Sequence, residues 1–318
     1  MTVSAAVRQL ARSRYVPRGR NQLHEIFARH FDEFCDQYED RHAKNYGHFR
    51  SERIEHVGRR CCDCGDYLQG VARIRCTNPD CRQNVRGVLQ TTFRPFSCKG
   101  RYLCPSCSQK RTLLFAEHLT DQVLLDLPHR QFVLTLPKAL RTLFRHDRRL
   151  FSSVSRLIFA LMAEFYAEAA GWPLMTGMIV AHQTYGDMLR FNPHFHAIVL
   201  EGGFDDEGTF FYIPFSGLDA MVEVFRRRVV WLLVEKELLA EDLAIRLLGW
   251  KHSGFSVDNS VRILDREARI YLAEYISRPP ISLKKIRYEP FRGRVLFHTK
   301  YSEYFGPTLA LVENCSHV

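Results

Sequence analysis

The sequence predicts an α+β protein in which a small cysteine-rich segment precedes a larger layer of strands and helices. Apolar runs of strand length alternate with longer stretches whose apolar residues recur at helical spacing, a pattern that favours a sheet with helices on one face. Eight of the ten cysteines fall between residues 61 and 107, in a stretch rich in arginine and punctuated by glycine. A chain of 318 residues has room for about two domains.

The N-terminal region predicts a basic arm followed by a helix. Residues 1–20 contain five arginines and little apolar surface, which is typical of a basic arm. From Leu23 to Tyr38 the apolar side chains recur at the positions of one helix face. These are Leu23, Ile26, Phe27, Phe31 and Phe34. We expect the apolar face of this helix to pack on the next domain or on a partner.

The cysteine-rich segment, roughly residues 56–112, predicts structural zinc. Clustered cysteines in a reducing compartment favour metal thiolates over disulfides. Tetrahedral zinc takes four ligands, and a step such as Cys104 to Cys107 supplies two of them from one tight turn. The expected zinc ligands are Cys61, Cys64, Cys76, Cys81, Cys98, Cys104 and Cys107. One or two ions fit this set, and the fourth partner of the last three cysteines comes from the earlier set or from His118.

The regions after this segment alternate between helical and strand patterns. In chain order we predict a connecting helix from after Arg111 to about Asp126, a buried strand over 131–137 that ends at a proline, a long helix over 150–170, a strand over 175–183 and a helical region over 218–248.

The next strand carries a pair of histidines. Residues 195–200 are an apolar run entered from a turn at Pro193. Side chains alternate along a strand, so His194 and His196 share one face. Two neutral imidazoles at such spacing can bind one cation, although two polar residues on a half-exposed strand remain an alternative. A His-x-His-x-His nucleotide hydrolase is disfavoured, because the next alternate position is Ile198.

A second candidate group lies on a helix predicted over residues 266–278, which ends before two prolines. Tyr271 and Tyr275 lie on one face of this helix, about 6 Å apart at Cβ, so both hydroxyls can reach one site. An aromatic stripe packed on a sheet is the alternative. A tyrosine nucleophile can form a phosphotyrosine. Because free tyrosine ionises only near pH 10, a metal and a basic neighbour such as Arg278 would have to assist.

The composition indicates what kind of partner the protein binds and in which compartment it is expected. Lys+Arg 45 against Asp+Glu 35 gives a net charge of +10 and a pI of about 9.2, which favours a polyanion such as nucleic acid. The first ten residues lack the apolar core of a signal peptide, and the longest apolar run is far shorter than a membrane span. We therefore expect a cytoplasmic protein without a membrane partner.

Five segments match a known order of motifs: residues 96–107, 132–137, 183–186, 193–197 and 271–278. As a set they resemble the two-tyrosine rolling-circle transposases of the HUH endonuclease superfamily, in the insertion-sequence group that includes the ISCR-like elements. The resemblance implies a zinc-binding N-terminal domain that helps recognise element DNA, followed by an HUH nuclease domain with a central antiparallel sheet. The resemblance also implies a bacterial protein of the cytoplasm that is associated with the nucleoid while it acts on DNA.

The resemblance also implies a chemistry. Such enzymes nick single-stranded element ends, become attached to the 5′ phosphate through tyrosine, and rejoin strands. By the resemblance His194 and His196 bind Mg²⁺ or Mn²⁺, with Tyr271 and Tyr275 as paired nucleophiles. Gln183 matches the place of a third metal ligand. A structural hydrogen-bonding role for Gln183, or ligation by the neighbouring His182, is the alternative.

The expected domains are a basic arm and helix (1–55), a zinc-binding domain (56–112), a connecting helix (113–127), an HUH nuclease domain (128–306) and a tail (307–318). Family members usually run well past this point. The tail is therefore expected to be aberrant or truncated, with the chemistry retained and complete transposition lost. The rival function is a non-catalytic zinc-dependent nucleic-acid-binding protein, whose histidine and tyrosine pairs are ordinary core or surface residues.

Overall fold

The structure is a computed structural model that describes residues 21–47, 51–78, 80, 90–100, 103–186, 189–215, 217–298 and 309–313. The chain divides into two compact units. We call them the sheet unit (Phe115–Ser277, with Met1–Arg12) and the cysteine unit (Ser13–Leu114 with Arg278–Val318). The basic arm predicted over residues 1–20 lies outside the described residues.

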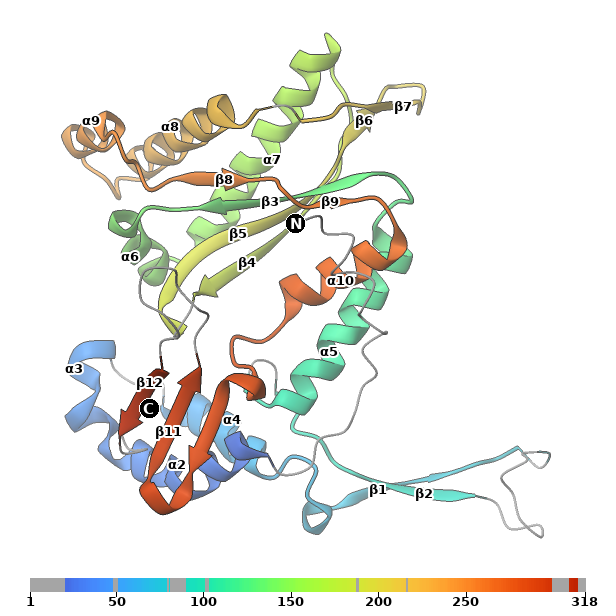
Figure 1. Ribbon diagram of the computed structural model, residues 1–318, viewed down its shortest axis with the longest axis vertical. Helices are drawn as coiled ribbons and strands as arrows, with labels where there is room; N and C mark the ends of the chain where they lie inside the picture. The colour runs from blue at the N-terminus through green and yellow to red at the C-terminus, as the bar shows by residue number, and fades with distance from the viewer. Residues whose placement is uncertain are drawn as a thin grey trace. The chain divides into compact units, whose positions relative to one another are not determined.

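The sheet unit is built on an antiparallel five-stranded sheet with the order β4-β5-β3-β8, and β9 also pairs with β3 (Figure 1). Its strands are β3 (His129–Thr135), β4 (Met178–Tyr185), β5 (Phe191–Leu200), β8 (Ser256–Asp258) and β9 (Arg262–Ile263); β6 (Gly202–Phe204) and β7 (Phe210–Tyr212) form a separate hairpin. β5 lies between β3 and β4, so both edges of its backbone are paired. The antiparallel pairing of these strands, together with the helices of the unit, confirms the predicted α+β class with a central antiparallel sheet.

Four helices accompany the first face of the sheet: α6 (Lys138–His146), α7 (Arg149–Ala170), α8 (Asp219–Glu235) and α9 (Glu241–Gly249). Phe195 points to this side, where its ring lies 6.4 Å from that of Phe144 and 5.8 Å from that of Phe151, centroid to centroid. The region over 218–248, predicted as continuously helical, is thus two helices. The main apolar core of the unit lies on this face.

α7 is long and apolar enough to cross a membrane by length and composition, and it is the one such helix among the residues the structure describes. Seven of its side chains are buried, including those of Val154, Ile158 and Met162, and they belong to the core on the first face of the sheet. Its apolar composition is therefore explained by packing.

The second face of the sheet is covered by α10 (Arg266–Ser277) together with the end of α5 (Pro105–His118) and the turn η2 (Leu119–Val123). Ile198 of β5 packs here with Leu272 and Ile276 of α10. The prediction of helices on one face only is therefore wrong. The physical reason is that part of this side is apolar as well: Ile198 of β5 and Ile179 and Ala181 of β4 pack in the same cluster as α10, so water is excluded from this face too. α5 also begins at Pro105, inside the cysteine motif, and not after Arg111 as predicted.

β5 begins at Phe191, so Pro193 lies within the strand and not in a turn before it. Proline has no N–H to donate to a neighbouring strand. Pairing with β3 ends at His194, and the register with β4 shifts between Gln183 and Tyr185. The missing donor therefore falls where the ladder is already interrupted.

The cysteine unit combines the N-terminal helices with a C-terminal sheet. Its elements are α2 (Gln22–Arg41), α3 (Ala43–Tyr46), α4 (Ser51–Cys62), η1 (Tyr67–Gln69), the ribbon β1 (Val71–Arg75) with β2 (Thr91–Pro95), the short turns η4 (Leu283–Lys285) and η5 (Pro290–Arg292), and the antiparallel strands β10 (Ile286–Glu289), β11 (Arg294–His298) and β12 (Leu309–Glu313). Part of the tail predicted over 307–318 is thus a strand paired with β11.

α2 packs on this C-terminal sheet. Leu23 and Ile26 are buried in one apolar cluster with Ile286, Tyr288 and Val295. The apolar face predicted for residues 23–38 therefore finds a partner within the chain. Further along α2, Phe31 meets α4: a Cβ added at Gly58 would lie 2.2 Å from the ring of Phe31. A glycine is needed there because the two helices approach closely.

Candidate functional site

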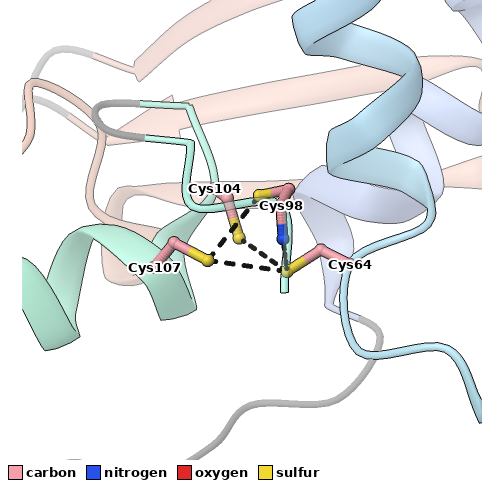
Figure 2. A group of neighbouring side chains, drawn as sticks. All are labelled: Cys64, Cys98, Cys104 and Cys107. Atoms are coloured by element: carbon pink, nitrogen blue, oxygen red, sulfur yellow. Dashed lines mark hydrogen bonds between the residues drawn. The ribbon is translucent and has the colours of Figure 1, made fainter. Parts of the chain in front are cut away.

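Four cysteines from three segments meet in the cysteine unit. Cys64 follows α4, Cys98 follows β2, and Cys104 and Cys107 lie at the start of α5 (Figure 2). The Sγ atoms of Cys64 and Cys107 are 3.6 Å apart, those of Cys98 and Cys107 are 3.6 Å apart, and those of Cys104 and Cys64 are 3.5 Å apart. The fourth partner left open by the sequence is therefore Cys64.

These distances fit a tetrahedral zinc ion. With a Zn–S bond of about 2.3 Å, the sulfur atoms of a ZnS₄ tetrahedron lie about 3.8 Å apart. The observed separations are within a few tenths of an ångström of that value. A site closed by four thiolates leaves no position for a water ligand, so its role is structural.

The backbone around Cys98 is shaped to approach its sulfur. Lys99 has a positive φ of 54°, and the Gly100 N–H donates to Cys98 Sγ at 3.3 Å. A Cβ at Gly100 would lie 3.2 Å from the same sulfur. The Cys98 N–H in turn donates to Cys64 Sγ at 3.4 Å. These N–H groups stabilise thiolates, which are the form that binds metal.

The four thiols influence one another's ionisation. Hydrogen bonding with Cys104 is the largest cause that raises the pKa of Cys64 and of Cys98, and it lowers the pKa of Cys107. One thiolate is therefore favoured by its neighbours, whereas the remaining protons must be displaced by a metal ion. Zinc binding accordingly releases protons and weakens as the pH falls.

The other predicted zinc ligands lie elsewhere. Among the described residues Cys76 joins no metal-binding group; its N–H extends the ribbon by donating to the Gln90 carbonyl. Cys81 lies outside the described residues. His118 is exposed and contacts Gln122 through Nδ1, so it is not the fourth ligand. Cys61 is buried and lies not in the four-cysteine cluster but beside it.

A histidine that the sequence reasoning missed lies against the cluster. His24, Cys61 and Cys104 place potential ligand atoms within 4.8 Å of one another. The Asn21 side chain caps α2: its Oδ1 accepts from the N–H groups of Leu23 and His24. This fixes the amide so that Asn21 Nδ2 donates to His24 Nδ1 at 2.8 Å.

The cap therefore determines which nitrogen of His24 carries a proton. Because Nδ1 is an acceptor here, the neutral ring carries its proton on Nε2. Hydrogen bonding to Cys104 raises the pKa of His24, although burial opposes the shift. His24 thus lies beside the four-cysteine cluster, next to Cys61 and Cys104. The sequence gave no indication of this contact, because His24 lies at the start of α2, far in sequence from Cys61 and Cys104.

The predicted histidine pair lies on β5 of the sheet unit, on the face covered by α10. The ring centroids of His194 and His196 are 4.9 Å apart. Two imidazoles that bind one ion at about 2.1 Å with an angle of 90–110° have centroids about 4.6–5.3 Å apart. The observed spacing is compatible with a shared ion.

Each ring is held through its Nδ1 atom. His194 Nδ1 donates to the Asn192 carbonyl oxygen at 2.8 Å, which leaves the Nε2 lone pair for a ligand. His196 Nδ1 lies 2.9 Å from the side-chain amide of Gln131 on β3. Gln131 is buried, and the sequence reasoning missed it, although a polar residue at the start of an apolar strand was a usable signal.

The two alternatives for a third ligand are separated by the pleat of β4. Gln183 pairs directly with His194, whereas His182 pairs with Phe195 and faces the opposite side. His182 Nε2 contacts the hydroxyl of Ser155, on α7. The Gln183 amide is buried, and its Nε2 has no hydrogen-bond partner among the described residues. The residue that shares a face with the histidines is therefore Gln183.

The two tyrosines of α10 differ in their surroundings. The Tyr275 ring packs edge-on against His196, with centroids 5.6 Å apart, whereas Tyr271 is exposed. Arg278 is also exposed. It follows the last residue of α10 and is the first residue of the C-terminal segment of the cysteine unit. The structure thus brings His194, His196, Gln183 and Tyr275 to one face of the sheet.

Buried histidines make the stability of the sheet unit depend on pH. Burial lowers the pKa of His129, His182 and His194. Because an unfolded histidine has a pKa of about 6.5, below that pH the unfolded chain binds protons that the folded unit does not. Stability is therefore fully present above about pH 6.5 and is lost as the pH falls through the lower folded-state values.

We therefore expect the urea midpoint of the sheet unit to be lower at about pH 5.5 than at about pH 7.5. All three tryptophans of the chain, Trp172, Trp231 and Trp250, belong to this unit, so their fluorescence reports its unfolding. A midpoint that is unchanged or higher at the lower pH would contradict the prediction.

Comparisons with known proteins cover most of the chain. A family model described as "Transposase zinc-binding domain" matches residues 26–136, which contain the four-cysteine cluster. A second, described as "Putative transposase", matches residues 177–308, which contain the histidine pair and α10. No solved structure matches the chain.

Two relatives are similar to this chain. The transposase for insertion sequence element IS801 from Pseudomonas savastanoi pv. phaseolicola is 28% identical over 261 residues, which cover 76% of this chain and 59% of that protein. A protein named "Putative transposase y4qJ" from Sinorhizobium fredii (strain NBRC 101917 / NGR234) is 32% identical over 119 residues, which cover 36% of this chain and 28% of that protein. The chain thus spans less than two thirds of the length of either relative.

Proposed function

Because the chain belongs to the family of insertion-sequence transposases that includes the IS801 protein, we propose that it cuts and rejoins single-stranded DNA at element ends through a tyrosine nucleophile. The proposed enzyme is a rolling-circle endonuclease of the HUH type. It nicks one strand, holds the 5′ phosphate as a phosphotyrosine and leaves a 3′ hydroxyl. The zinc-binding unit takes part in recognising the DNA.

One observation carries the proposal: Tyr275 packs against His196 on the sheet face that also holds His194. A histidine pair on a strand and a tyrosine on a helix, far apart in the sequence, thus lie together, as a metal-assisted tyrosine nuclease requires. An ordinary aromatic stripe explains the tyrosine but gives no reason for two histidines to lie against it. The non-catalytic binding protein is therefore the less supported function.

The donor set suits a divalent cation. In the proposal His194 Nε2, His196 Nε2 and the Gln183 amide oxygen hold the ion. A mixture of imidazole nitrogen and amide oxygen fits Mn²⁺ better than Mg²⁺. When bound, the ion would polarise the scissile phosphate and stabilise the charge that develops there.

Gln131 then serves as a positioning residue. A histidine that binds metal through Nε2 usually donates Nδ1–H to a second group, which fixes the ring. A half-turn of the Gln131 amide places its oxygen at the observed 2.9 Å from His196 Nδ1, ready to accept that proton. The carbonyl of Asn192 plays the same part for His194.

The transfer step is an in-line displacement at phosphorus. The Tyr275 oxygen forms the new P–O bond and its proton passes to solvent, while the bond to the 3′ oxygen breaks and that oxygen leaves as a hydroxyl after taking a proton. Arg278, three residues further along, is proposed to bind a phosphate oxygen through its guanidinium. Tyr271, one turn earlier and more exposed, is proposed to act on a second strand.

A covalent-adduct assay tests this function. The full chain is incubated with Mn²⁺ and labelled single-stranded DNA that carries candidate element ends, and the DNA-linked protein is resolved on a denaturing gel. Formation of an adduct would support the proposal. If no adduct forms while the DNA is bound, the chain is instead a non-catalytic zinc-dependent binding protein.

His194→Ala is expected to reduce the rate of adduct formation by more than about 100-fold, because loss of a metal ligand should exceed the 10–100-fold typical of losing a supporting residue. DNA binding, measured by fluorescence anisotropy, should change little. His252→Ala, at an exposed histidine of the same unit, is the matched control. Cleavage at the original rate by His194→Ala would exclude the metal role.

A further inference from the structure

The ribbon formed by β1 and β2 is exposed on both faces. Of its ten residues seven are exposed and none is buried. In Figure 1 the ribbon extends away from the helices of its own unit. An isolated two-stranded ribbon is only marginally stable in water. Because this ribbon buries no apolar core, we infer that its exposed surface serves binding.

The side chains of the ribbon have one sign of charge. Arg73 and Arg75 lie on β1 and Arg94 on β2, and all three are exposed. Neither residues 67–78 nor residues 90–100 contain an aspartate or glutamate; the nearest acidic side chain before the ribbon, Asp66, is occupied in capping η1. Such a surface is complementary to a polyanion.

The register divides these residues between two faces. Arg73 pairs directly with Phe93 and Arg75 with Thr91, so these four side chains share one face. Arg94 pairs with Ala72 and lies on the other face. The first face therefore carries two guanidinium groups beside an exposed aromatic ring, and the second carries one guanidinium group.

We propose that the β1–β2 ribbon is a docking surface for duplex DNA, with the Arg73 face turned toward the nucleic acid. The major groove of B-DNA accommodates a two-stranded ribbon, and guanidinium groups contact both phosphates and guanine edges. A single strand would call for several stacking side chains, whereas this face offers only Phe93. The inference rests on the proposed DNA transposase and assigns the DNA recognition proposed for the zinc-binding unit to one surface and to duplex DNA.

The test compares charge-neutralising variants on the two faces. Binding of the full, zinc-loaded chain to a labelled duplex is measured by fluorescence anisotropy at several salt concentrations. Each lost phosphate contact reduces the slope of log K against log salt by about 0.9. Arg73→Gln with Arg75→Gln is therefore expected to reduce the slope by about 1.8. Arg94→Gln and Arg287→Gln, the latter at an exposed arginine of β10, should leave the slope nearly unchanged.

The outcomes separate this inference from the proposed function. The double variant is expected to retain its zinc and to form the covalent adduct with single-stranded DNA at a rate within about twofold of the original chain. An unchanged salt slope on the duplex would overturn the ribbon proposal. So would an equal loss of affinity for single-stranded DNA, because the ribbon would then be a strand-binding surface. Failure of the original chain to form any adduct would instead count against the proposed function alone.

Discussion

Tyr275→Phe is expected to abolish the covalent protein–DNA adduct, with a loss of at least about 10³-fold, because removal of a nucleophile leaves no group to form the phosphotyrosine. The phenyl ring preserves the packing of Tyr275 against His196, so the fold should be unchanged. The measurement is the initial rate of adduct formation with Mn²⁺ and single-stranded DNA, at protein in excess over DNA.

Tyr271→Phe and Tyr67→Phe serve as comparisons. Tyr271 is exposed, and we expect its variant to keep the first adduct but to impair transfer to a second strand. Tyr67, an exposed residue of the cysteine unit, should have no effect. If Tyr271→Phe removed the adduct and Tyr275→Phe did not, the order of the two nucleophiles would be reversed. If neither variant changed the rate, tyrosine chemistry would be excluded.

Cys104→Ser is expected to release zinc and to unfold the helices of the cysteine unit. Cys104 is fully buried and is one of four converging thiols, so its loss removes a ligand that no solvent-exposed group replaces. Structural zinc sites contribute about 10–16 kcal/mol of apparent binding energy to folding. We expect loss of about one equivalent of zinc by mass spectrometry and faster proteolysis within residues 21–114.

Cys35→Ser is the matched control, because Cys35 lies on α2 outside both metal-binding groups. It should retain its zinc and its resistance to protease. The tryptophan fluorescence transition should be similar in both variants, since all three tryptophans lie in the sheet unit. Unchanged zinc content in Cys104→Ser would refute the four-cysteine assignment.

Much of the fold could be predicted because the relevant signals are local. The spacing of Leu23, Ile26 and Phe31 predicted α2, which the structure confirms. Alternation placed His194 and His196 on one face of β5, and their rings are adjacent. Periodicity of apolar side chains depends on backbone geometry alone, so it is readable without knowledge of neighbouring elements.

Other features depended on contacts between distant segments. The spacing named seven cysteines as ligands and left the fourth partner of the last three open, yet four cysteines meet in one cluster and Cys61 lies beside it. The choice depends on where α4, β2 and α5 begin and end, which the spacing does not encode. His24 and Gln131 escaped notice for the same reason: each acquires its role through a partner from another segment, Cys104 in one case and His196 in the other.

The sequence by itself determined the α+β class, the presence of a zinc-binding segment, the placement of two histidines on one face of a strand and that of two tyrosines on one face of a helix, because each follows from residue type and local periodicity. Only the tertiary structure decided that helices cover both faces of the sheet, that Cys64 completes the cluster, and that Gln183 and not His182 shares the histidines' face. It also decided that Tyr275 is the tyrosine beside His196. These outcomes depend on strand register and helix packing, which are set by burial of apolar surface across the whole unit.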